Sequence, residues 1–216
     1  MRSQAELETI TAREILPLFT LQAVLFTAAG LGLWYASGRS AAAFVVVDPH
    51  AIFWGLALAA TMIAFAYGVF RGVPEWGDHL VRLQRENFAF LKQPFSLAAI
   101  VWLSICAGVG EEALFRGGLQ TLLTDYIGAT PAILIASALF ALIHLGKPIL
   151  TALIFVIGVL FGYVYAQTGS LLLVMIAHTV YDVFAIWYLR RRMFALGLFD
   201  VADETTREEG STNATD

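Results

Sequence analysis

The sequence predicts an all-α polytopic membrane protein with about six transmembrane helices and one cytoplasmic, interfacial amphipathic helix. Of the 216 residues, 59% are hydrophobic and only 14% are charged, whereas soluble domains carry about 25% charged residues. Six apolar runs approach or exceed the roughly 18–20 residues that a membrane-spanning helix needs. They cover residues 15–36, 51–71, 96–123, 129–146, 149–167 and 170–190. We expect residues 1–199 to form a single transmembrane domain.

The distribution of positive charge predicts how these helices are oriented. If six helices cross the membrane and both termini lie on one side, all but two of the 13 Lys and Arg residues fall on that side. Arg39 lies on the opposite side, and Arg116 lies within the membrane. Because basic residues concentrate in cytoplasmic loops, we expect both termini to be cytoplasmic.

Two segments outside the apolar runs have their own character. In the long connection 72–94, apolar residues recur near helical spacing and charged residues cover other faces: Trp76, Leu80, Leu83 and Leu91 against Arg82, Arg85 and Glu86. This pattern predicts an amphipathic helix at the cytoplasmic membrane surface. Residues 200–216 are acidic and polar, which predicts a disordered cytoplasmic tail.

Six ionisable residues lie at membrane depth, where each charge costs roughly 2.5–3.5 kcal/mol and usually marks function. They are Glu111, Glu112, Arg116, His144, His178 and Asp182. Glu112 and Arg116 share a helical face at i,i+4, as do His178 and Asp182, whereas Glu111 has no local partner. Such groups can also hold helices together without any chemistry. Six of them on three helices instead favour proton transfer or metal binding, either of which activates water.

Three segments carry a resemblance to a known family: Glu111-Glu112-Ala-Leu-Phe-Arg116, Phe140-x-x-x-His144 and His178-x-x-x-Asp182. In this order they resemble the motifs EExxxR, FxxxH and Hxxx(Asn/Asp) of the CPBP (CAAX protease and bacteriocin-processing, or Abi) family of intramembrane endopeptidases. The resemblance covers about residues 96–190. It implies an endopeptidase, similar to CAAX prenyl proteases, that hydrolyses peptide bonds of a membrane-associated peptide or protein. We expect that substrate and the lipid bilayer as partners, and no nucleic acid.

The resemblance also implies roles for single residues. Glu111 and His144 match the family's glutamate and histidine that activate a water molecule. His178 and Asp182 match the pair that stabilises the oxyanion of the tetrahedral intermediate. Such a glutamate-type mechanism needs no cofactor.

The resemblance assigns Glu112 and Arg116 to the support of Glu111, and it leaves the role of Asp182 open. The commoner family residue at position 182 is Asn, whose amide can donate to an oxyanion, whereas an ionised Asp182 cannot. Either Asp182 is protonated, or it keeps His178 oriented and charged while His178 alone faces the oxyanion. We narrowly favour the second arrangement, because the pair forms within one helix.

Two alternatives remain open from the residues. A zinc protease would use His144 and His178 with one or two of Glu111, Glu112 and Asp182, the simplest set being Glu111, His144 and His178. The sequence has no HExxH motif, which argues mildly against zinc. A protein of another class, such as a bacteriocin-immunity protein, a scaffold or a proton-coupled transporter, would also use acidic and histidine residues within the membrane.

Overall fold

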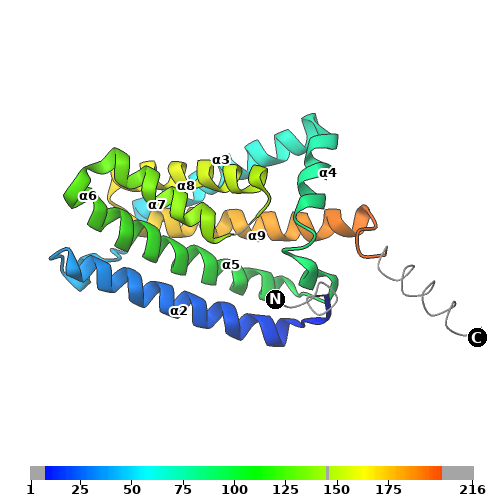
Figure 1. Cartoon of the computed structure of the whole chain (residues 1–216), viewed down its shortest axis with the longest axis horizontal. Helices are drawn as coiled ribbons and strands as arrows, with labels where there is room; N and C mark the ends of the chain where they lie inside the picture. Colours follow the sequence, from blue (N-terminus) through cyan, green and yellow to red (C-terminus); the bar gives the residue numbers. More distant parts are fainter. Residues whose placement is uncertain (1–7, 145, 201–216) are drawn as a thin grey trace, which may run out of the picture.

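The computed structural model describes residues 8–144 and 146–200, and these residues form helices and no strands. The all-α prediction is therefore confirmed (Figure 1). The elements are α2 (Ala12–Ala36), η1 (Ala41–Ala43), α3 (Pro49–Gly72), α4 (Pro74–Leu83), η2 (Ala89–Lys92), α5 (Leu97–Glu112), η3 (Ala113–Gln120), α6 (Thr121–Ile127), α7 (Ala129–Ile143), α8 (Pro148–Thr168) and α9 (Leu171–Ala195). The predicted acidic tail lies outside the described residues, apart from Asp200.

Helix boundaries follow from local capping chemistry. Asp48 precedes α3, and its side chain accepts a hydrogen bond of 3.1 Å from the backbone N–H of His50. The Ser170 side chain caps α9 in the same way. Gly128 and Gly169 have φ angles of +83° and +64°, so each ends a helix with a backbone that other residues rarely adopt. The chain can thus reverse between apolar helices within one or two residues.

Among the residues that the structure describes, five helices are long and apolar enough to cross a membrane: α2, α3, the continuous run Leu97–Ile127, α8 and α9. The sixth predicted crossing, 129–146, is shorter than expected, because α7 ends at Ile143 and has only 15 residues. At 1.5 Å per residue α7 extends over about 22 Å, less than the ~30 Å hydrocarbon core. His144, which caps α7, therefore lies at the end of a short helix.

The amphipathic helix predicted over 72–94 is also shorter than expected. Helix α4 covers only Pro74–Leu83, and the rest of the connection continues through turns into the single 3₁₀ turn η2. Leu91 of η2 is fully buried, whereas Trp76 of α4 is 43% exposed. The apolar residues of this connection therefore divide between a helix at the surface and a turn buried in the bundle.

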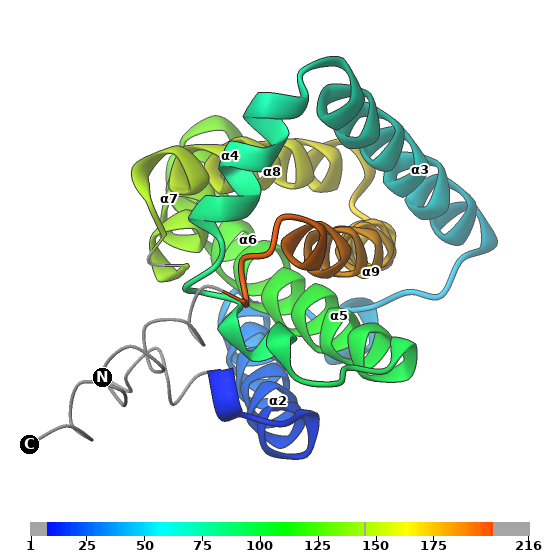
Figure 2. The ribbon, with the colours of Figure 1, turned by 90° about the vertical axis from the view of Figure 1, so that its right-hand side faces the viewer.

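Helix α9 lies in the middle of the bundle, beside α3, α5 and α8 (Figure 2). On one side of α5, a Cβ atom at Gly110 would stand 2.7 Å from the Cα atom of Ala23 in α2. On another side, a Cβ atom at Gly108 would overlap Thr179 of α9. Small residues let helix backbones approach closely within a membrane. Gly108 and Gly110 therefore let α5 pack closely against α9 and α2 immediately before Glu111.

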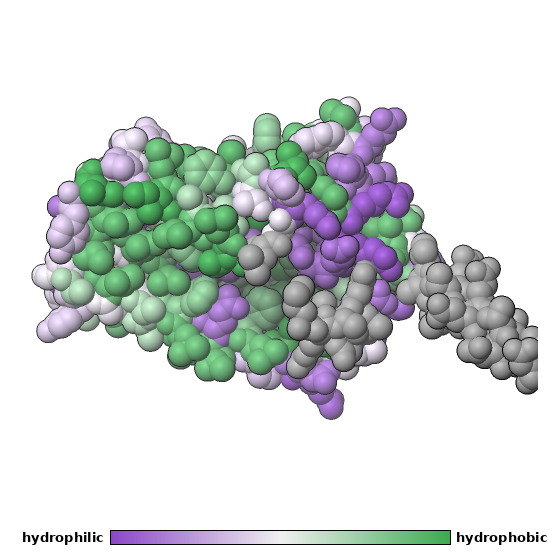
Figure 3. Space-filling model, in the orientation of Figure 1, coloured by the Kyte–Doolittle hydropathy of each residue, from purple (hydrophilic) through white to green (hydrophobic). Residues whose placement is uncertain are grey.

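Large hydrophobic side chains cover the outside of the bundle, as expected for a surface that faces lipid (Figure 3). Charged residues pair at the two ends. At one end, Arg39 contacts both carboxylate oxygens of Asp125, at 2.6 and 2.8 Å. At the other end, Asp78 of α4 contacts Arg192 of α9 at 2.7 and 2.8 Å, which lowers the pKa of the Asp78 carboxyl group. The bundle thus has two polar ends, where these ion pairs lie, and an apolar middle between them.

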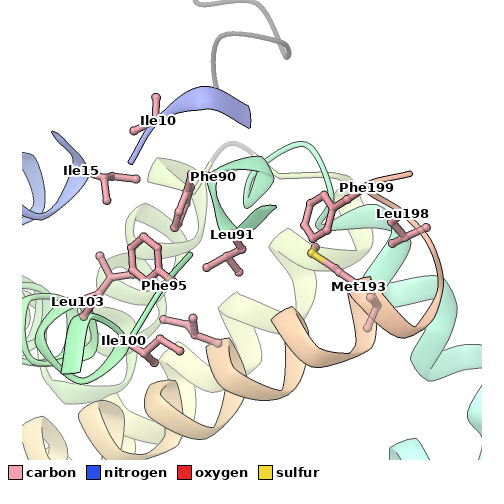
Figure 4. Close-up of a cluster of buried hydrophobic side chains, with 13 residues drawn as sticks. Ile10, Ile15, Phe90, Leu91, Phe95, Ile100, Leu103, Met193, Leu198 and Phe199 are labelled. Carbon is pink, nitrogen blue, oxygen red and sulfur yellow. The ribbon is translucent and has the colours of Figure 1, made fainter. Parts of the chain in front are cut away.

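A cluster of buried hydrophobic side chains fixes the connection before α5 to the bundle (Figure 4). Phe90 and Leu91 of η2, together with Phe95, pack with residues from the start of α2, from α5, and from the end of α9 and beyond: Ile15, Ile100, Leu103, Met193, Leu198 and Phe199. The charged end that carries α4 is thus part of the packed structure.

The charge pattern and this arrangement together predict the membrane topology. Reporter fusions at Asp48, Asp125 and Gly169 should report an extracytoplasmic position, because these residues lie on the side with little positive charge. Fusions at Glu86, Lys147 and within 200–216 should report the cytoplasm. Paired alkaline phosphatase and fluorescent protein fusions measure this directly, and a cytoplasmic signal at Asp125 would contradict the arrangement.

Candidate active site

The six residues singled out from the sequence lie together in the structure. Glu111 and Glu112 end α5, Arg116 belongs to η3, His144 caps α7, and His178 and Asp182 lie one turn apart on α9. Ion-pair contacts of 4.0 Å or less connect all six side chains. Segments up to 71 residues apart in sequence, from Glu111 to Asp182, thus form one site.

Arg116 and Glu112 form the fully buried part of the site, since neither side chain is exposed at all. The Nε atom of Arg116 lies 3.3 Å from Oε2 of Glu112, without the alignment of a hydrogen bond. Arg116 Nη2 donates to the carbonyl oxygen of Gly158 at 3.0 Å, and its Cζ atom lies 4.9 Å from the ring centroid of Phe140. An ion pair, one hydrogen bond and an aromatic face therefore surround this cation.

The backbone that carries Arg116 is a π-helix, Ala113–Gln120. Such wide turns are rare and occur frequently at functional sites. The wide turn begins directly after Glu112, and the carbonyl of Ala113 overlaps the position that a Cβ atom at Gly30 of α2 would occupy. Glycine at position 30 therefore lets α2 pack against the start of the π-helix.

His178 lies between the three carboxylates of the site. Its Nδ1 atom is 2.8 Å from Oε1 of Glu112, a hydrogen-bond distance. Its Nε2 atom is 3.8 Å from Oε2 of Glu111 and 3.5 Å from Oδ2 of Asp182. The ring of Phe161 from α8 stacks on the imidazole, with centroids 5.3 Å apart and planes inclined by 24°. Both the position and the plane of the His178 ring are thus fixed.

His144 faces Glu111 from the end of α7. Its Nδ1 atom lies 2.8 Å from the carbonyl oxygen of Phe140. Because a carbonyl oxygen only accepts, Nδ1 must donate, and the neutral ring then carries its lone pair on Nε2. That Nε2 atom is 4.0 Å from Oε2 of Glu111, too far for a direct hydrogen bond. The imidazole is therefore arranged to accept a proton or to coordinate a ligand beside Glu111.

A cavity of about 690 Å³ reaches these groups. Glu111, His144, His178 and Asp182 line it, whereas Glu112 and Arg116 do not. Its other walls are mostly apolar and come from α2, α3, α4, α5, α7, α8 and α9 and from the connection after α4. The four lining residues can meet a bound molecule, and the buried pair supports them from behind.

The donor types at the site suit zinc, since two imidazoles and a carboxylate form an acceptable ligand set. Among the described residues, however, no group of three His, Cys, Asp or Glu side chains is arranged to hold a metal ion. The Nε2 atoms of His144 and His178 stand 4.0 and 3.8 Å from the same oxygen of Glu111.

Sequence reasoning found all six residues but missed their contacts between helices. The i,i+4 pairs Glu112–Arg116 and His178–Asp182 are both present. The shorter contact of Glu112, with His178, joins residues 66 apart and has no signal in the spacing. Phe161, which lines the cavity and stacks on His178, was also missed, because it lies in a uniformly apolar helix.

Comparisons with known proteins identify the family of this chain. A family model described as type II CAAX prenyl endopeptidase Rce1-like matches residues 93–184, which include all six site residues. The uncharacterized protein YpbD of Bacillus subtilis (strain 168) is 31% identical over 168 residues, which cover 75% of this chain and 82% of YpbD. This chain belongs to the CPBP family. The match to an Rce1-like model indicates a membrane-embedded protease. No solved structure matches the chain significantly.

The buried pair predicts a large effect of Arg116 on stability. Replacing Arg116 with Ala removes the counter-charge of Glu112 in a place without solvent, so Arg116→Ala should lose about 3–5 kcal/mol of stability. Thermal unfolding of the purified protein in detergent measures this change. Arg13→Ala, at the start of α2, is the control for removal of an arginine. An unchanged melting temperature in Arg116→Ala would show that the ion pair does not support the fold.

Proposed function

We propose that this protein is a glutamate-type intramembrane endopeptidase that hydrolyses a peptide bond of a membrane-associated peptide or protein. The observation that carries the proposal is the arrangement of Glu111 between two histidine nitrogens at the wall of an apolar cavity. The family match supports a protease.

Glu111 and His144 activate the attacking water. The 4.0 Å between Oε2 of Glu111 and Nε2 of His144 leaves room for a water molecule to hydrogen-bond both atoms. Glu111 accepts one proton of this water, and the oxygen attacks the carbonyl carbon of the scissile bond. His144 holds the water in line, because its Nδ1–H is engaged with the carbonyl of Phe140.

His178 stabilises the tetrahedral intermediate that this attack forms. Its Nδ1–H donates to Glu112, and in the imidazolium form its Nε2–H points into the cavity, where the oxyanion develops. Collapse of the intermediate breaks the C–N bond. The proton held by Glu111 passes to the leaving amine, which regenerates the carboxylate.

Glu112 is the orienting carboxylate in this scheme. Of the two candidates, it makes the shorter contact with His178, 2.8 Å against 3.5 Å for Asp182. Glu112 is itself fully buried beside Arg116, whereas the side chain of Asp182 is 24% exposed. These distances support Glu112, in place of Asp182, as the residue that we propose orients His178.

The roles of Glu111 and His144 predict a shared loss of activity. Glu111→Gln and His144→Ala should each abolish cleavage of a quenched fluorescent peptide library by protein in detergent, while the melting temperature stays close to wild type. The double variant should be no worse than either single one, because residues that act as a unit are lost together. Wild-type rates in Glu111→Gln would refute the proposal.

The same assay tests the zinc alternative. Dialysis against a strong chelator should leave the wild-type rate unchanged within about twofold, because no step of the proposed reaction passes through a metal. Loss of activity on chelation, with recovery on added zinc, would favour the set Glu111, His144 and His178 as ligands.

Asp182→Asn tests which carboxylate orients His178. Because Glu112 holds Nδ1, the variant should keep its rate within about tenfold of wild type. Its amide can donate to the oxyanion. A loss of about 10²-fold or more, as follows removal of an orienting carboxylate in catalytic triads, would return the orienting role to Asp182. Circular dichroism and melting temperature serve as controls for folding.

A further inference from the structure

Gln22 is the polar residue of α2 that the site described above leaves without a role. Between Glu14 and the end of α2, it is the only Asp, Glu, Lys, Arg, His, Asn or Gln. Its side chain is half-buried and lines the same cavity as Glu111.

No group among the described residues hydrogen-bonds the Gln22 carboxamide. Elsewhere in α2, Thr20 is engaged with the carbonyl of Leu16 at 2.8 Å and with the indole of Trp102 at 2.9 Å. An amide at membrane depth without a partner is costly, so polar side chains there normally pair across helices. Gln22 instead lines the cavity with a carboxamide that no described residue hydrogen-bonds.

Gln22 lies at the level of the reacting groups. Ala23, the next residue, lies against the backbone of Gly110, and Gly110 directly precedes Glu111. The two adjoining helices thus place Gln22 and Glu111 within about one helical turn of each other along the cavity wall. The other carboxamides at the cavity, Gln84 and Asn87, lie in the connection after α4 and hydrogen-bond each other at 3.3 Å.

An extended peptide is the ligand that this chemistry fits. A segment that enters an apolar cavity at membrane depth brings backbone N–H and C=O groups that have lost water and have no helical partners. A primary carboxamide can accept from one peptide N–H and donate to one C=O. The apolar walls of the cavity offer few other groups of this kind near Glu111.

We propose that Gln22 is a substrate-binding residue whose carboxamide pairs with the substrate's peptide backbone beside the scissile bond. The inference rests on the proposed endopeptidase function and adds a residue of the first apolar helix to it. Backbone pairing does not depend on the side chains of the substrate. Gln22 therefore contributes to affinity for any sequence that fits the apolar walls.

The test compares kcat and KM of wild type, Gln22→Met and Glu111→Gln on the best-cleaved peptide of a quenched fluorescent library. Met keeps the length and flexibility of Gln but forms no such hydrogen bonds. Loss of one or two neutral hydrogen bonds should raise KM roughly three- to tenfold and leave kcat within about twofold. Leu21→Met, which places the same side chain on the exposed neighbouring position, should match wild type.

The outcomes separate this inference from the function on which it rests. A raised KM in Gln22→Met, with Leu21→Met normal and Glu111→Gln inactive, supports both. Unchanged KM in Gln22→Met, with Glu111→Gln inactive, overturns the role of Gln22 and leaves the protease intact. If the wild type cleaves no peptide, or Glu111→Gln remains active, the proposed function fails and the role of Gln22 fails with it.

Discussion

The guanidinium group of Arg116 is a permanent cation without any exposed surface, and the site is organised around its neutralisation. Each of its three neighbours also supports a catalytic candidate. Glu112 contacts His178, the backbone carbonyl of Phe140 contacts His144, and Gly158 lies on α8 one turn before the ring that stacks on His178. The groups that stabilise the buried charge of Arg116 therefore also position the imidazole rings of His144 and His178.

Close backbone packing fixes this arrangement in place. Lipid provides no hydrophobic driving force between helices, so contact depends on fit. Gly30, Gly108 and Gly110 let α2 and α9 approach the run from α5 to η3 at the residues around Glu111. On the far side, Gln120 donates to the carbonyl oxygen of Gly162 at 2.9 Å, four residues beyond the acceptor of Arg116. The segment with the glutamates is thus held by several neighbouring helices.

The sequence predicted the fold class and the positions of most helices, because apolar runs and capping residues are local signals. It also singled out the six candidate residues that the structure brings together, because charges are conspicuous among Leu, Ile and Phe. It did not predict the early end of α7 before His144, the π-helix after Glu112, or the contact between Glu112 and His178. These three features depend on how the helices pack against one another. An evenly apolar sequence has no hydrophobic periodicity from which that packing could be predicted.

The π-helix accommodates one extra residue between two sets of contacts. A π-helical turn contains about one more residue than an α-helical turn. In an α-helix, each added residue rotates the residues that follow by about 100° around the helix axis. Before the wide turn, the side chain of Glu112 hydrogen-bonds His178. After the wide turn, Gln120 hydrogen-bonds the backbone of Gly162, and Thr121 hydrogen-bonds Tyr165. An extra residue in a regular α-helix would turn one set of contacts away from the other, and the wide turn absorbs that residue instead. Deleting one residue within Ala113–Gln120 would therefore restore a regular α-helix and keep both sets of contacts facing their partners.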